Sequence, residues 1–219
     1  MTDPTGTMPG LILVAPAGSD PAAQTTMLQS AFGGAATGHS IDAVLIGAGM
    51  DETSAQAAAR AQVALVQDHG AAAIIVEHSR IASRTGADGV HVGTGRADIK
   101  AAVAAFKPDR IVGAGNLKSR HAAMEAGSED IDYVLFGQLR GDTHPEPHPK
   151  AVNLAAWWAD VMEIQVVLQA GNSIDALENL PQNIDFIALD LAVWEYPGGP
   201  ASAVRKARSI LSNVSEQAR

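Results

Sequence analysis

Histidine and glutamate side chains that can bind a metal ion or move a proton occur at three places in the sequence. They end one hydrophobic run, lie within the next, and fill a proline-rich segment further on: Glu77 and His78, then His91, then His144, Glu146 and His148. Neutral imidazoles and carboxylates are competent ligands for Zn²⁺ or Mn²⁺. One hypothesis is therefore a His/Glu metal-dependent enzyme, with at most one of Glu77 and His78 facing the site, because neighbours on a strand point to opposite faces.

Four positive charges occur near the same segments of the sequence: Arg96, Lys118, Arg140 and Lys150. Lysine and arginine side chains there can recognise a carboxylate or a phosphate, or can simply be solvated surface charges. The N-terminal part of the chain is different, because no lysine or arginine precedes Arg60. The first two hydrophobic runs therefore cannot provide a cation from their own ends.

Eight short hydrophobic runs must position these side chains. They alternate with stretches rich in Ala, Gln, Glu and Arg, which favour helix, and they span Leu11–Ala17, Ile41–Ala48, Ala72–His78, Gly89–Thr94, Arg110–Asn116, Tyr133–Leu139, Ile164–Ala170 and Phe186–Ala192. Runs of this length are typical of parallel strands that are buried on both faces. The pattern predicts an α/β fold, a single (β/α)₈ TIM barrel, with a doubly wound open sheet as the alternative.

Length and composition limit the organisation of the chain and its partners. We expect one domain over residues 1–219, with residues 1–10 as a flexible N-terminus. The net charge of −9 argues against a nucleic-acid partner. We expect no membrane binding and a cytoplasmic location, because no apolar run approaches the length of a spanning helix and the N-terminus lacks a basic signal region. With no cysteine, only His, Asp and Glu remain as strong side-chain metal ligands.

Functional residues of such a barrel lie at the carboxyl ends of the strands and in the loops that follow them. The longest of these loops is predicted at Arg140–Lys150, where three prolines favour extended or turn geometry. Glycines at strand ends would let a ligand approach the backbone closely: Gly113, Gly115, Gly137 and Gly171. The predicted ligand-binding set adds four other strand-end residues: Asn116, Gln138, Ala170 and Asp190.

Gly86–Gly93 reads GADGVHVG, which resembles the GADGVHLG block of thiamine-phosphate synthases and their TenI-type relatives. The order of the surrounding strands resembles that family as well, over roughly residues 71–139. The resemblance implies a homodimeric barrel that joins hydroxymethylpyrimidine diphosphate to thiazole phosphate and releases pyrophosphate with the help of Mg²⁺. It further implies small-molecule partners, a heterocycle or a phosphate ester. His91 belongs to the resembling block and is a candidate catalytic residue.

The resemblance also places the metal site of the family on this sequence. One family aspartate that binds Mg²⁺ falls on Glu77, which can still bind a hard cation through oxygen. The second falls on Arg96, and Asp98 lies two residues further on. The resemblance therefore implies Glu77 and Asp98 as metal ligands, although a carboxylate in the first turn of a helix also has a structural role beside the helix dipole.

The anion-binding positions of the family depart from its pattern in this sequence. The Arg and Lys that end the second strand of the family are replaced by the segment Ala43–Ala48, and Lys150 is the candidate for the catalytic Lys after strand six. The phosphate-contacting Ser of strand eight falls on Leu191, beside Asp190, whose carboxylate would repel a phosphate. The alternative hypothesis is a repurposed relative that binds a small heterocycle without pyrophosphate chemistry.

Overall fold

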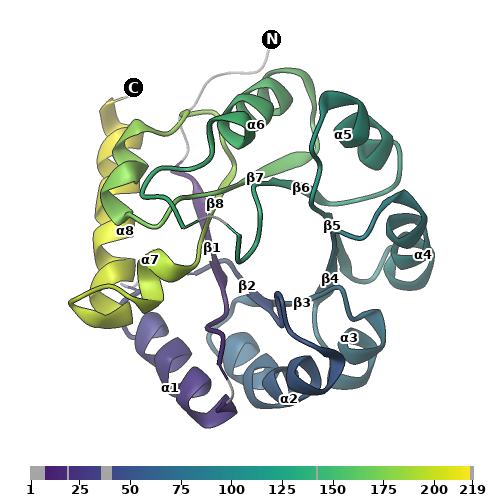
Figure 1. Cartoon of the computed structure of the whole chain (residues 1–219), viewed down its shortest axis with the longest axis horizontal. Helices are drawn as coiled ribbons and strands as arrows, with labels where there is room; N and C mark the ends of the chain where they lie inside the picture. The colour runs from purple at the N-terminus through teal and green to yellow at the C-terminus, as the bar shows by residue number, and fades with distance from the viewer. Residues whose placement is uncertain (1–7, 19, 36–40, 142, 218–219) are drawn as a thin grey trace.

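The computed structural model describes residues 8–18, 20–35, 41–141 and 143–217. Eight parallel strands form a closed barrel in which each strand is hydrogen-bonded to the next and β8 returns to β1 (Figure 1). The strands are β1 Gly10–Val14, β2 Ala43–Ile46, β3 Ala72–Val76, β4 Gly89–Val92, β5 Ile111–Ala114, β6 Tyr133–Phe136, β7 Gln165–Gln169 and β8 Phe186–Leu189. The predicted (β/α)₈ barrel is confirmed, and each strand lies within or within one residue of its predicted run.

Helices surround the barrel, and two shorter elements interrupt the regular alternation. The helices are α1 Pro21–Phe32, α2 Glu52–Asp68, α3 Ser79–Thr85, α4 Arg96–Phe106, α5 Arg120–Gly127, α6 Pro149–Val161, the one-turn α7 Leu191–Trp194 and α8 Gly199–Gln217, with the 3₁₀ helix η1 Ile174–Asn179 between β7 and β8. Asp20 and Asp51 accept backbone N–H bonds at the starts of α1 and α2, which stabilises helix termini. Within the described residues, no helix has the length and apolarity needed to span a membrane.

Alternate strand residues face the helices and the barrel interior, which gives two hydrophobic clusters. The interior cluster includes Ile12, Val14, Leu45, Ile74, Leu135 and Val167. The same alternation directs four polar side chains inward: His91, Tyr133, Gln169 and Asp190. All four are at most 6% exposed, so each needs an internal partner or an incoming ligand.

An aspartate directly precedes each even-numbered strand. Its carboxylate accepts the backbone N–H of the second residue of the preceding strand at 2.7 to 2.8 Å, in the pairs Asp42 with Leu11, Asp88 with Ala73, Asp132 with Val112 and Asp185 with Val166. At these points the neighbouring strand has not yet begun, so its backbone offers no acceptor. The four carboxylates therefore complete the hydrogen bonding at the N-terminal end of the barrel.

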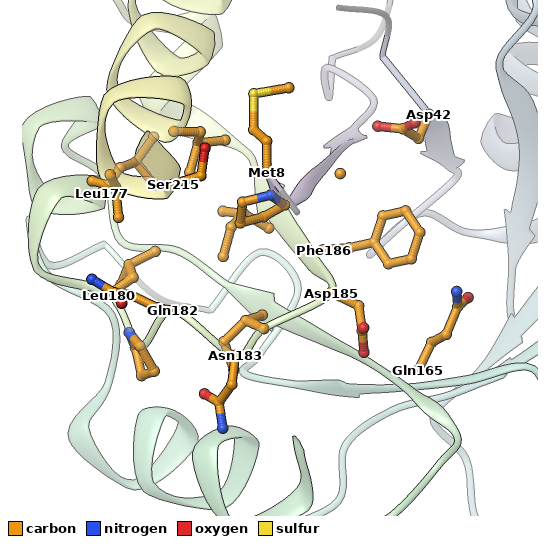
Figure 2. A pocket seen from close by; sticks show the side chains of 17 residues that line it. Met8, Asp42, Gln165, Leu177, Leu180, Gln182, Asn183, Asp185, Phe186 and Ser215 are labelled. Atoms are coloured by element: carbon orange, nitrogen blue, oxygen red, sulfur yellow. The ribbon is translucent and has the colours of Figure 1, made fainter. Parts of the chain in front are cut away.

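The N-terminal end of the barrel also carries a cavity of about 550 Å³ between β1, β8, η1 and α8. Figure 2 shows Phe186 between Asp42 and Asp185, and Met8 and Leu180 also line the cavity. Of the segment expected to be flexible, residues 1–7 lie outside the described residues, whereas Pro9 is buried and Gly10 opens β1. Residues at this end of a barrel serve stability, because the chemistry lies at the opposite end.

We expect Asp185→Ala to lower the free energy of unfolding by about 1 to 3 kcal/mol, because the buried N–H of Val166 loses its acceptor. Asp185→Asn, which keeps one acceptor oxygen, should lose less. Urea denaturation measures both. Asp109→Ala is the control, since Asp109 is exposed and no hydrogen bond to its side chain is described. Equal stability of the Asp185→Ala and Asp109→Ala variants would contradict the role assigned to the carboxylate.

Candidate active site

The carboxyl ends of β2 to β6 surround a cavity of about 370 Å³. We call it the mouth cavity. The residues that line it include five from the predicted site: Glu77, His91, Asn116, Gly137 and Gln138. The structure therefore brings together residues that are up to 61 positions apart in the sequence, since Glu77 and Gln138 share one cavity wall.

Glu77 and His78 both line the mouth cavity, so the expectation that only one of them faces the site is wrong. The physical reason is that β3 ends at Val76 and Glu77 has a left-handed φ of 68°, which breaks the alternation of a strand. The backbone N–H of Glu77 still donates to the His91 carbonyl at 2.8 Å. The Glu77 carboxylate lies toward Gly93, where an added Cβ would be 3.0 Å from Oε1.

His91 and Tyr133 form a buried pair inside the barrel. His91 Nδ1 lies 3.0 Å from the Tyr133 hydroxyl, and the two rings are stacked with centroids 5.6 Å apart. Burial lowers the pKa of His91 to about 4 and, together with the nearby charge of Asp132, raises the pKa of Tyr133. His91 is therefore neutral near pH 7 and presents a hydrogen-bonding nitrogen without a charge.

Gly113 and Gly115 make room for this pair rather than leaving open space. A Cβ on Gly113 would overlap the Tyr133 ring, and a Cβ on Gly115 would overlap His91 Nε2. Both glycines are buried in or just beyond β5. The close approach predicted for a ligand is thus made by protein side chains, and a ligand reaches these glycines only past His91 and Tyr133.

A long loop follows β6 and runs over the open end of the barrel toward β8 and β1 (Figure 1). We call residues 137–148 the mouth loop; the structure describes all of them except residue 142. At its start lies Arg140, which has a left-handed φ of 62°. The Arg140 guanidinium donates to the carbonyls of Ala15, after β1, and Ala48, after β2. A cation thus reaches the ends of the two strands that provide none themselves.

Arg140 also forms a salt bridge with Asp190 at the end of β8, with 2.5 Å between Nη1 and Oδ1. The two side chains are only 16% and 8% exposed. Burial raises the pKa of Asp190 to about 6, against the opposing effect of Arg140. Burial likewise lowers the pKa of Arg140, against the effect of Asp190. The negative charge that the sequence places beside the phosphate position is therefore paired with a protein cation.

The mouth loop also covers the end of β7. The backbone N–H groups of Asn172 and Ser173 donate to the carbonyls of His144 at 2.6 Å and of Pro145 at 3.1 Å. A Cβ on Gly171 would overlap the Pro145 carbonyl. Barrels commonly bind phosphate with backbone N–H groups at this place. In this structure loop carbonyls accept from these N–H groups, next to Gly171, where the sequence predicted a ligand close to the backbone.

Ala170, the remaining predicted residue at the end of β7, and its neighbour Gln169 are both buried. Ala170 is 2% exposed and its N–H donates to the Ala188 carbonyl. Gln169, which was not predicted, is 4% exposed, and its Oε1 has no hydrogen-bond partner within the described residues. A Cβ on Gly137 would overlap the Gln169 side chain, so Gly137 also makes room for protein.

A second cavity of about 410 Å³ adjoins the first, because Asn116, Gly137 and Gln138 line both. We call it the cationic cavity. Lys118, after β5, and Lys150, at the start of α6, line it together with the imidazoles of His144 and His148. No carboxylate is among its lining residues in the described part of the chain. The two cavities adjoin: the first is lined by the neutral His91 and by the Glu77 carboxylate, and the second by two lysines.

The predicted metal ligands are not brought together. Asp98 is exposed in the first turn of α4 and does not line the mouth cavity, and Arg96 contacts Glu129 and Glu125 on the outer surface. Across residues 8–217, leaving aside the gaps in the description, no three His, Asp or Glu side chains are close enough to hold a metal ion. The hypothesis of a His/Glu metal enzyme is therefore not supported by the site.

Sequence reasoning missed the internal roles of Arg140, Tyr133 and Gln169. Arg140 looked like one of four equivalent charges near the site, because nothing local indicates that it crosses the barrel. Alternation along a strand directs Tyr133 and Gln169 inward. This signal could be used only with the register of β6 and β7, which the structure gives.

Comparisons with known proteins agree with the barrel and with the sequence motifs. A family profile described as thiamine monophosphate synthase matches residues 11–193. The chain is 32% identical over 167 residues to the thiamine-phosphate synthase of Hyphomonas neptunium, covering 75% of this chain and 76% of that protein. It is 38% identical over 142 residues to that of Rhodospirillum centenum, covering 64% and 69%.

Solved structures with little sequence identity share the fold. The thiamine phosphate pyrophosphorylase from Pyrococcus furiosus has a TM-score of 0.73 at 19% identity, covering 97% of this chain and 99% of that chain. KGPDC from Streptococcus mutans has a TM-score of 0.67 at 14% identity, covering 95% and 99%. These likenesses support the barrel architecture alone.

We expect the His91 ring to stay neutral from about pH 8 to about pH 5, because its pKa in the folded chain is about 4. The unfolded chain takes up this proton first, so the free energy of unfolding should fall as the pH drops from about 6.5 toward about 4. Imidazole NMR signals measure the protonation directly. His121, whose side chain is 84% exposed, is the internal reference. A His91 signal that titrates together with His121 would contradict the buried neutral pair.

Proposed function

The chain belongs to the thiamine monophosphate synthase family, and on that premise we propose that it joins a hydroxymethylpyrimidine diphosphate to a thiazole phosphate in the mouth of the barrel. The observation that carries the proposal is the pair of adjoining cavities, one with the uncharged polar groups of His91, Asn116 and Gln138 beside the Glu77 carboxylate, the other with two lysines. Both substrates are flat heterocycles with phosphate groups. Such molecules need an uncharged surface at one end and positive charge at the other.

The mouth cavity is the proposed place for the ring. His91 is neutral there, and Asn116 and Gln138 add uncharged hydrogen-bonding groups. In the reaction the C–O bond to the diphosphate breaks, and the pyrimidine methylene carbon forms its new bond to the thiazole nitrogen. A neutral imidazole next to a developing carbocation avoids the repulsion that a charged one would cause.

The cationic cavity is the proposed place for the departing pyrophosphate. Lys118 and Lys150 bring two positive charges to it, and no ion pair with a carboxylate is described for either lysine. Charge-assisted hydrogen bonds from lysine to phosphate oxygens strengthen as negative charge collects on the leaving group. In this proposal Lys150 has the catalytic role that the family resemblance implies, and Lys118 is a second cation for the same group.

Mg²⁺ is the ion used by this family, and the residues present fit it poorly. Of the two predicted ligands, only Glu77 lines the mouth cavity, and Mg²⁺ requires near-octahedral oxygen coordination. In this proposal the two lysines neutralise the negative charge of the leaving pyrophosphate. The homodimer, the cytoplasmic location and the single domain over residues 1–219 stay predictions.

A second candidate function is a barrel that binds one heterocycle without pyrophosphate chemistry. The observation that favours it is the closure of the β7 end, where the N–H groups of Asn172 and Ser173 are already bonded to the mouth loop. A second phosphorylated substrate would have to displace these carbonyls. The two candidates differ in whether pyrophosphate is ever released.

We expect the purified protein to form thiamine phosphate from the two substrates. Lys118→Ala and Lys150→Ala should each lower kcat/KM about 10-fold to 100-fold, because each removes a charged hydrogen bond worth roughly 1.5 to 3 kcal/mol. Product formation followed by chromatography measures this. Lys100→Ala is the matched control, since Lys100 is exposed on α4 and outside both cavities.

The outcomes separate the two candidate functions. A folded protein that forms no thiamine phosphate, yet binds an uncharged pyrimidine or thiazole in calorimetry, would favour the second candidate. An active protein in which both lysine variants match Lys100→Ala would contradict the assignment of the leaving group to the cationic cavity.

A further inference from the structure

Arg140 is the cation that the described structure brings to the ends of β1, β2 and β8, a part of the mouth that lies largely outside the two cavities. Its guanidinium bonds to Ala15, Ala48 and Asp190. These three bonds use three of the five N–H donors of a guanidinium. The Arg140 side chain is 16% exposed, so these bonds hold a largely buried cation at the mouth of the barrel.

The Arg140 side chain borders the mouth cavity through Gly49. A Cβ on Gly49 would lie 3.3 Å from Arg140 Cγ, and Gly49 lines the cavity. The base of the Arg140 side chain therefore lies beside the mouth cavity, whereas its guanidinium is bonded to the ends of β1, β2 and β8. The chain has no earlier lysine or arginine than Arg60, so the ends of β1 and β2 depend on this loop residue for positive charge.

Asp190 binds the Arg140 guanidinium from within the protein, at the place where the anionic group of a ligand could bind it. Its carboxylate is buried, and it stands next to Leu191 at the start of α7, with Glu195 as the other acidic group acting on it. Burial raises the pKa of Asp190 to about 6, against the opposing effect of Arg140, so burial disfavours the charged form of this carboxylate. An oxyanion with a higher charge is a competent rival for the same guanidinium, since arginine binds carboxylate and phosphate in the same geometry.

We propose that Arg140 is a specificity-determining residue that binds the pyrophosphate or phosphate group of a substrate, and that Asp190 competes with this group for the guanidinium. In the structure the Arg140 guanidinium donates to Asp190. In the complex it donates instead, with at least one N–H group, to the oxyanion of the substrate. The proposal rests on the proposed function for the nature of the substrate, but it concerns anion binding alone.

The test measures the affinity of the full chain for inorganic pyrophosphate and for sulfate by calorimetry, without metal ions and without the heterocyclic substrates. Asp190→Asn should bind pyrophosphate about 5-fold to 50-fold more tightly than the unmodified chain, because the competing charge is removed while a similar shape remains. Arg140→Gln should weaken binding by at least about 10-fold. The double variant should bind as weakly as Arg140→Gln alone, since Asp190 acts through Arg140.

Asp109→Asn is the matched control, because it removes one exposed negative charge and changes the net charge equally. An Asp190→Asn variant that binds no more tightly than Asp109→Asn would overturn the proposal, as would an Arg140→Gln variant with unchanged affinity. If Asp190→Asn fails to fold, as seen by circular dichroism, Arg140→Lys decides instead: it keeps the charge and should bind pyrophosphate more tightly than Arg140→Gln.

This experiment is independent of catalysis. A chain that forms no thiamine phosphate can still show competition between Asp190 and pyrophosphate, in which case the proposed function fails and this inference stands. An active chain in which Asp190 and Arg140 variants bind pyrophosphate like the unmodified protein gives the reverse result.

Discussion

Four carboxylates complete the hydrogen bonding at the N-terminal end of the barrel. Each accepts the N–H of a strand residue at a point where the next strand has not yet begun, in the positions Asp42, Asp88, Asp132 and Asp185. A buried N–H without an acceptor costs about as much as a lost hydrogen bond. Because this end is fixed by its own hydrogen bonds, the opposite end can vary without loss of the fold.

The interior of the barrel then decides what the variable end can hold. Small residues on β5 leave room for His91 and Tyr133, so a polar pair replaces the aliphatic packing found between β1, β2 and β3. Burial keeps the imidazole neutral. Core packing therefore makes the His91 side of the mouth cavity uncharged, and the positive charge of the site comes from Lys118 after β5 and Lys150 at the start of α6.

The mouth loop adds a further positive charge and limits the space at the same time. Its start brings Arg140 to the ends of β1, β2 and β8, and its later carbonyls bind the N–H groups after β7. The departures of the sequence from its family, in strand two and strand eight, meet at Arg140, which bonds to the ends of both strands. A cation missing from the strand ends is delivered from the other side of the barrel, and the carboxylate that would repel a phosphate is paired with it.

The sequence by itself determined the barrel, the family resemblance and five of the residues that line the mouth cavity, because hydrophobic periodicity and the Gly86–Gly93 block are local patterns. It placed Glu77, His91 and Gln138 at one end, since parallel strands share a direction. Only the tertiary structure decided that Arg140 pairs with Asp190, 50 positions away, and that Asp98 stays outside the cavity. Such pairings depend on the path of a loop across the barrel, which no local pattern of residues encodes.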